Sequence, residues 1–148
     1  MERRLAREAA MCLYYERAIK KDPHADSTTL IDMGDVLHRA RLDDENLAYI
    51  DSALHLYEQH LSEIDACIEQ YCRTWKLDRL SRVDLSILRL AVAEMRYIDE
   101  IPYKVSVNEA VELAKKYSDE KSPNFINGIL RAISQAENER QAGGYAFF

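Results

Sequence analysis

Nine apolar residues in the middle of this chain are spaced alternately three and four positions apart. Such spacing lines one face of an α-helix, and taken alone it is typical of a coiled-coil seam. Ser62, followed by an acidic residue at position 65, has the form of a helix N-cap, so two packed helices broken at Ser62 are the alternative. We favour the break, because the rest of the chain predicts short capped helices. The nine residues are Leu47, Ile50, Leu54, Tyr57, Leu61, Ile64, Ile68, Tyr71 and Trp75.

Helix-start signals recur in the second half of the sequence. Ser81 precedes a first turn that contains Asp84, and the segment that follows is apolar almost all round, which predicts a central, enclosed helix. Ser106 and Glu109 have the spacing of a capping box. Ser122–Pro123 supplies an N-cap with proline at the first helical position. Further helices are expected at residues 2–21 and from about residue 27.

The composition agrees with a helical fold. The chain is 47% hydrophobic and 31% charged, has only four glycines and three prolines among 148 residues, and contains no strand pattern of credible length. The sequence therefore predicts a compact all-α bundle of about seven helices in one structural domain. We expect an N-terminal lobe at residues 1–75, a C-terminal lobe at 76–137 and a flexible tail at 138–148.

Signatures of catalysis and of metal binding are missing from the sequence. The glycines form no phosphate-binding loop, and no nucleophile stands beside a base. Cys67 and Cys72, like His55 and His60, are five positions apart, so a helix turns the members of each pair to different faces. We expect a protein that is not an enzyme and that needs no metal or cofactor.

Three cysteines cannot all pair, which favours a reducing, cytoplasmic setting over a disulfide scaffold. Wholly apolar runs such as Leu90–Ala93 are far too short to cross a membrane, and we expect neither a signal peptide nor a membrane span. The net charge of −6 argues against indiscriminate binding to nucleic acid, but it leaves room for a local basic site.

One candidate for such a site is the arginine-rich start of the first helix. At 100° per residue, the guanidinium groups of Arg3, Arg4 and Arg7 fall within an arc of roughly 100°. Positive charge at a helix N-terminus opposes the helix dipole, so a role outside stability is expected. Guanidinium groups match phosphate oxygens and stack on bases, which predicts RNA or another polyanion as the partner. The alternative is solvated arginines that pair with Glu2 and Glu8.

A second candidate lies at the start of the last helix. Phe125, close to Lys121, is placed to stack on an unpaired base. Gly128 lies inside the same helix, where glycine lowers helix stability by up to ~1 kcal/mol relative to alanine. The close approach of another helix or of a ligand would explain why glycine occurs there. The alternative is that Phe125 forms the edge of the core.

Two sets of residues carry a resemblance that covers nearly the whole chain. The weaker set is Arg3–Ala10 with Tyr14–Glu16. The more specific set is Leu80–Ala91, Glu94, Ile101–Pro102, Val105, Val107–Lys115 and Phe125–Leu130, in that order. In both sets the sequence resembles the family of the bacterial transcription antitermination factor NusB.

This resemblance implies an all-helical fold with two lobes, and binding of the single-stranded boxA element in nascent, chiefly ribosomal, RNA. It also implies a heterodimer with NusE, a protein of the small ribosomal subunit, that joins RNA polymerase with other Nus factors and suppresses premature termination. Family members occur as monomers and as homodimers, and the sequence leaves both open.

The resemblance also implies roles for single residues. Arg3, Arg4 and Arg7 would contact RNA phosphates and bases, Lys121, Phe125 and Asn127 would line the RNA path, and Tyr15 and Asp84 would meet NusE. Two positions depart from the family, because Leu5 replaces a basic residue and Lys121 stands where acidic residues occur. Engaging about three phosphates of single-stranded RNA gives a slope of log K against log salt of only about −2. We therefore expect weak RNA binding by the chain alone and further affinity from NusE.

Two rival functions remain open on the sequence. RNA cytosine methyltransferases carry a NusB-like helical domain, and the chain would then be a stand-alone relative of it. No strand followed by a Gly-rich loop is present, which excludes the methyltransferase activity itself. The other rival is a helical module that binds only protein, with its arginines merely solvated.

Overall fold

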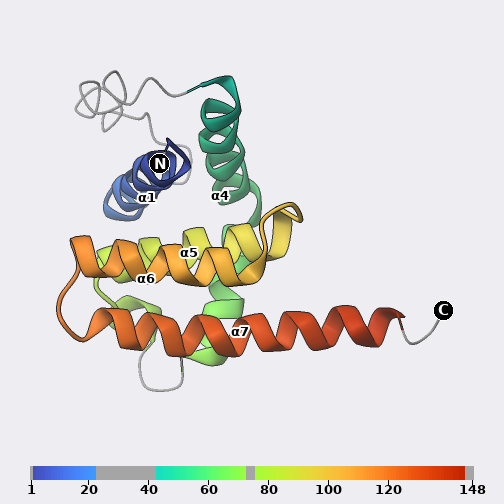
Figure 1. Cartoon of the computed structure of the whole chain (residues 1–148). Helices are drawn as coiled ribbons and strands as arrows, with labels where there is room; N and C mark the ends of the chain where they lie inside the picture. Colours follow the sequence, from blue (N-terminus) through green and yellow to red (C-terminus); the bar gives the residue numbers. More distant parts are fainter. Residues whose placement is uncertain (1, 23–42, 73–75, 146–148) are drawn as a thin grey trace.

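The computed structural model of the chain describes residues 2–22, 43–72 and 76–145 (Figure 1). These residues form helices and no strand, so the all-α prediction is confirmed. They contain five α-helices rather than about seven, and the helix expected from residue 27 lies outside the described residues. The elements are α1 (Glu2–Lys20), α4 (Asp44–Tyr71), the 3-10 helix η1 (Leu77–Arg79), α5 (Arg82–Tyr97), α6 (Tyr103–Tyr117) and α7 (Ser122–Tyr145).

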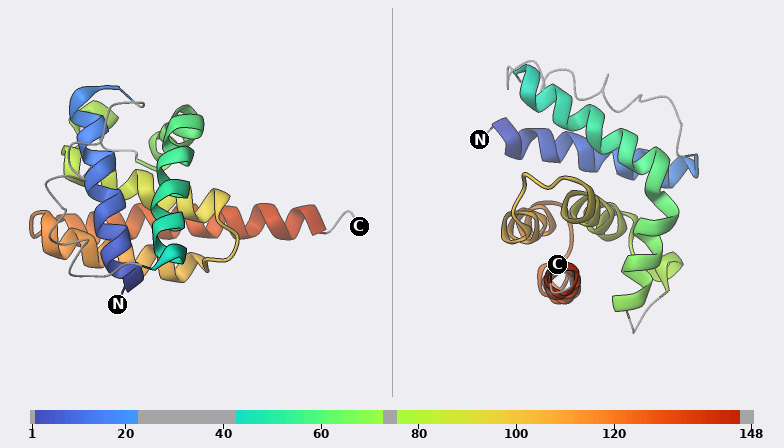
Figure 2. Two further views of the ribbon diagram at one scale, coloured as in Figure 1. Left: turned by 90° about the horizontal axis from the view of Figure 1, so that it is seen from above. Right: turned by 90° about the vertical axis from the view of Figure 1, so that its right-hand side faces the viewer.

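Helix α5 occupies the centre of the molecule, as its apolar sequence predicts. The Ser81 hydroxyl accepts a hydrogen bond from the backbone N–H of Asp84 at 3.1 Å, which confirms the expected N-cap. Every residue from Asp84 to Met95 is buried. The right-hand view of Figure 2 shows α1 and the first half of α4 above α5 and α6, with α7 below them. The central helix therefore contacts α1, α4, α6 and α7.

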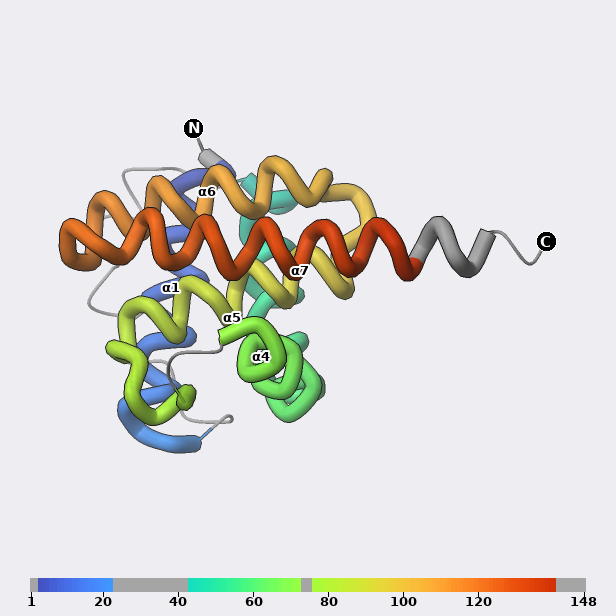
Figure 3. The backbone as a smooth tube through the Cα atoms, turned by 90° about the horizontal axis from the view of Figure 1, so that it is seen from below, coloured from blue at the N-terminus to red at the C-terminus, as the bar shows by residue number. Residues whose placement is uncertain are grey.

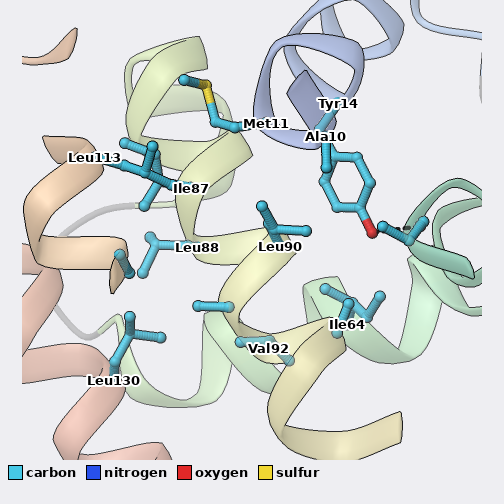
Figure 4. Packing of buried hydrophobic residues seen from close by; sticks show 14 of the residues in the cluster. Ala10, Met11, Tyr14, Ile64, Ile87, Leu88, Leu90, Val92, Leu113 and Leu130 are labelled. Atoms are coloured by element: carbon cyan, nitrogen blue, oxygen red, sulfur yellow. Dashed lines mark hydrogen bonds between the residues drawn. The ribbon is translucent and has the colours of Figure 1, made fainter. Parts of the chain in front are cut away.

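Side chains from all five α-helices meet in the core around α5 (Figure 4). Tyr14 of α1 inserts its ring toward α4, where its hydroxyl donates a hydrogen bond to the carbonyl oxygen of Ala53 at 2.6 Å. Ile87 and Leu113 join α5 to α6, and Leu130 brings in α7. Each such side chain contributes about 1.5–3 kcal/mol when it is removed from water.

Helix α4 is continuous but bent. His60 has non-helical backbone angles (φ −123°, ψ 15°), two residues before the break that the sequence predicts at Ser62. The expected break is thus a kink within one helix. The imidazole of His60 stacks on the ring of Tyr97, with centroids 4.2 Å apart. The bend lets the first half of α4 pack beside α1 while the second half descends toward α7 (Figure 2).

Helix α6 begins four residues earlier than the predicted capping box at Ser106 requires. Its N-cap is Pro102, whose φ of −60° suits the start of a helix, and Ser106 lies inside the helix. The buried Ser106 hydroxyl donates a hydrogen bond to Glu94, and Glu109 accepts hydrogen bonds from Arg4. The capping-box prediction is wrong, because both side chains bond to distant residues instead of the local backbone.

Helix α7 continues to Tyr145, past residue 138, where the sequence predicts a tail. Glu137 explains part of the extension, because its buried carboxylate pairs with Arg96 at 3.3 Å and with Arg140, one turn later, at 2.6 Å. Helix α7 extends beyond the other helices (Figure 1), and Figure 3 shows it running beside α6.

Candidate nucleic-acid interface

Arg7 lies inside the protein and not at the surface, where the sequence places it. Its Nε and Nη2 donate to the two carboxylate oxygens of Glu94 at 2.9 and 3.1 Å, and both side chains are almost completely buried. Glu94 also accepts hydrogen bonds from the hydroxyls of Tyr49 and Ser106. A buried carboxylate needs such partners, and Arg7 supplies the charge that balances it. Arg7 therefore ties α1 to the centre of the fold.

Arg4 makes a similar pair at the surface. Its Nε and Nη2 each lie 3.1 Å from a carboxylate oxygen of Glu109 on α6. The Arg4 side chain is 59% exposed, so its guanidinium faces solvent as the sequence predicts.

Arg3 points toward α4. Its Nε donates to the Asn46 side-chain oxygen at 2.6 Å, and its guanidinium lies 4.7 Å from the centre of the Tyr49 ring. Glu45 approaches its Nη2 to 3.8 Å. The three arginines thus diverge from their common arc, because each follows a different acidic or polar partner.

Lys121 and Phe125 come together at the junction of α6 and α7. They line a hollow of about 410 Å³ that also contains Asp84 and Arg79. Phe125 is half-buried and packs against the core with one side, so it forms the core edge and a wall of the hollow at once. Asn127 lies outside this hollow, and its side-chain oxygen accepts a hydrogen bond from Arg131 at 3.1 Å.

Gly128 faces open space on α7. A Cβ atom built at this position would meet nothing within 4 Å among the described residues. The sequence suggests two explanations for this glycine, and one of them, the close approach of another helix, does not hold for the helices that the structure describes.

Asp84 and Tyr15 differ in exposure. The Asp84 carboxylate is nearly buried and accepts hydrogen bonds from the hydroxyls of Ser118 and Ser122 at 2.6 and 2.9 Å. It therefore fixes the turn that carries Lys121. Tyr15 is exposed on α1, and Ile19, one turn later, is 53% exposed, so the two form an apolar strip on the surface.

Sequence reasoning misses one cluster of cations, Lys115 and Lys116 at the end of α6. They line a hollow of about 350 Å³ between α1 and α6, together with Arg4. The Lys116 ammonium donates to Glu8 on α1. Lysines are common in the last turn of a helix because they complement its dipole, so the local pattern carries no functional signal.

The described part of the chain contains no group of histidine, cysteine or acidic side chains that could hold a metal ion. None of its helices combines the length and the apolar character that a membrane span requires.

The described part of the chain is an all-α fold in which charged side chains line hollows between helices. The model of the NusB family matches residues 4–135. The chain is 45% identical over 141 residues to the transcription antitermination protein NusB of Natranaerobius thermophilus, which covers 94% of this chain and 99% of that protein. The chain belongs to the NusB family.

Two solved structures show the same fold. One is T. maritima NusB, which is 31% identical and superposes with a TM-score of 0.75 over 90% of each chain. The other is a complex of the antitermination factors NusB and NusE with double-stranded RNA. The matched chain of that complex is 29% identical to this one, and the two superpose with a TM-score of 0.75 over 91% of this chain and 97% of the other.

Proposed function

We propose that this chain is a transcription antitermination factor that binds the single-stranded boxA element of nascent, chiefly ribosomal, RNA together with NusE. The observation that carries the proposal is the family match over residues 4–135, with relatives named as antitermination proteins and one solved structure of NusB and NusE in complex with double-stranded RNA. The factor joins RNA polymerase and other Nus factors in the cytoplasm. It acts by binding and performs no catalytic step.

The proposed RNA path runs from the start of α1 to the start of α7. Arg4 contacts phosphate, Lys121 contacts phosphate at the other end, and Phe125 stacks on an unpaired base. The exposed guanidinium of Arg4 and the hollow shared by Lys121 and Phe125 support this path. Arg3 and Asn127 lie at its edges. Arg7 contributes indirectly, because its pair with Glu94 fixes α1.

The proposed NusE surface includes Tyr15 and Asp84. The exposed strip formed by Tyr15 and Ile19 supports an apolar contact on α1. Asp84 acts through the turn that it holds with Ser118 and Ser122. We also propose the division into lobes at residues 1–75 and 76–137, which is supported by the stacking of α1 and the first half of α4 on α5 and α6.

Fluorescence anisotropy with labelled RNA tests the function. Mixed with NusE, the chain is expected to bind single-stranded boxA RNA more tightly than the same RNA in a duplex or a scrambled strand. Phe125→Ala is expected to weaken boxA binding by about tenfold, since one base loses its stacking partner. Arg4→Ala and Lys121→Ala weaken it without changing the thermal unfolding midpoint. Equal affinity for boxA and scrambled RNA would instead favour a module that binds only protein.

A further inference from the structure

Helices α1 and α6 border the hollow of about 350 Å³ that contains Arg4, and its lining is almost entirely charged. Each basic side chain in it bonds a carboxylate. The pairs are Arg4 with Glu109, Lys115 with Glu112, Lys116 with Glu8, and Arg7 with Glu94, which lies outside the hollow. The cations of the proposed RNA path at this end are thus already occupied by acidic groups of the protein.

Two of these pairs have the same geometry but different surroundings. Arg4 and Arg7 lie one turn apart on α1, and each presents Nε and Nη2 to both oxygens of a glutamate. The side chains of Arg7 and Glu94 are 6% and 2% exposed, whereas those of Arg4 and Glu109 are 59% and 20% exposed. The inner pair is held by burial, because breaking it would leave an uncompensated charge away from water. The outer pair is open to exchange.

A phosphate group presents the same two-oxygen edge to a guanidinium as a carboxylate does. Water screens exposed ion pairs, so the Glu109 carboxylate holds Arg4 only weakly. An RNA strand that places a phosphate at Arg4 also releases counterions, which favours the exchange. Glu109 is fixed on α6 beside the buried Ala110, so after displacement its charge stays close to the incoming phosphate.

We propose that Glu109 sets the RNA affinity of this protein by occupying Arg4 in the free state, and that an RNA phosphate takes its place in the complex. The inference rests on the proposed function and adds to it a residue that opposes binding. It gives a physical reason for weak binding by the chain alone, since each phosphate contact at this end must first break an internal pair.

The full chain offers a matched pair of variants. Glu109→Gln and Glu112→Gln remove the same charge from the same hollow, but Glu112 bonds Lys115 and not Arg4. In the presence of NusE, Glu109→Gln is expected to tighten binding of labelled RNA roughly three- to fivefold more than Glu112→Gln does. In an Arg4→Ala background this difference is expected to vanish. Circular dichroism checks that all variants keep the helical fold.

The measurement is made with boxA RNA and with an unstructured strand of unrelated sequence, because phosphate exchange does not depend on the bases. Equal gains for the two glutamine variants on both RNAs, or a difference between the two variants that persists without Arg4, overturn the role of Glu109. A lack of preference for boxA over the unrelated strand overturns the proposed function. If the affinity gain of Glu109→Gln still exceeds that of Glu112→Gln on both strands, the result supports the exchange at Arg4.

Discussion

Glu94 is the residue on which the packing of four helices converges. Its carboxylate accepts hydrogen bonds from Arg7 of α1, Tyr49 of α4 and Ser106 of α6 while it projects from α5. Arg4, one turn before Arg7, is chemically the same side chain with the same kind of partner, yet it stays in water. Burial therefore decides which arginine stabilises the fold and which can bind a ligand.

Glu94→Gln tests the structural role of this cluster. The amide keeps the shape of the side chain but leaves the Arg7 charge buried without a counter-charge, so the free energy of unfolding is expected to fall by about 3–5 kcal/mol. Urea denaturation followed by circular dichroism measures the change. Glu112→Gln, at an exposed position on α6, is the control. A loss smaller than about 1 kcal/mol would show that the buried pair contributes little.

Alkaline pH tests the same cluster through Tyr49. Burial, with the nearby Glu94 charge, raises the pKa of Tyr49 well above its ordinary value near 10. Above pH ~10 the unfolded chain loses the phenolic proton while the folded chain keeps it. The free energy of unfolding therefore keeps its full value below that pH and falls as the pH rises further. Tyr49→Phe is expected to reduce the slope of unfolding free energy against pH between about pH 10 and 11. An unchanged slope would contradict this account.

At the scale of helices, local signals predict some boundaries and fail at others. The N-cap at Ser81 follows from its neighbours alone, and it appears as expected. The capping box at Ser106 and Glu109 fails because these side chains bond Glu94 and Arg4, and the sequence pattern of a cap does not reveal distant partners. The kink at His60 falls two residues from the predicted break, since its stacking on Tyr97 depends on the packing of α4 against α5.

Gly128→Ala tests helix α7. A methyl group at this exposed position meets no protein atom within 4 Å, so alanine should bring its higher helix propensity without a clash. The expected gain is up to ~1 kcal/mol of unfolding free energy, measured as a rise in the thermal midpoint. Ala132, an exposed alanine one turn later, provides the reverse control as Ala132→Gly, which should lower the midpoint. A lower midpoint for Gly128→Ala would contradict the open environment.

At the scale of the whole molecule, the residue types of the candidate site are visible in the sequence but their arrangement is not. Lys121 lies in the turn just before α7, and its carbonyl oxygen accepts a hydrogen bond from the backbone N–H of Phe125, so local geometry brings the two side chains to one hollow. The pairing of Arg4 with Glu109 joins positions 105 residues apart, and it depends on the tertiary fold, in which α1 and α6 both pack on α5. The cations around Arg4 are paired with carboxylates of the protein itself.

The affinity for boxA RNA, measured with and without NusE, tests the central claim most directly. Labelled single-stranded RNA is titrated with the chain, with NusE and with an equimolar mixture, and size-exclusion chromatography shows which components travel together. We predict weak binding by the chain alone, much tighter binding by the mixture, and one complex that contains both proteins and the RNA. Equal affinity in the presence and absence of NusE, or RNA that elutes apart from the two proteins, would contradict the account.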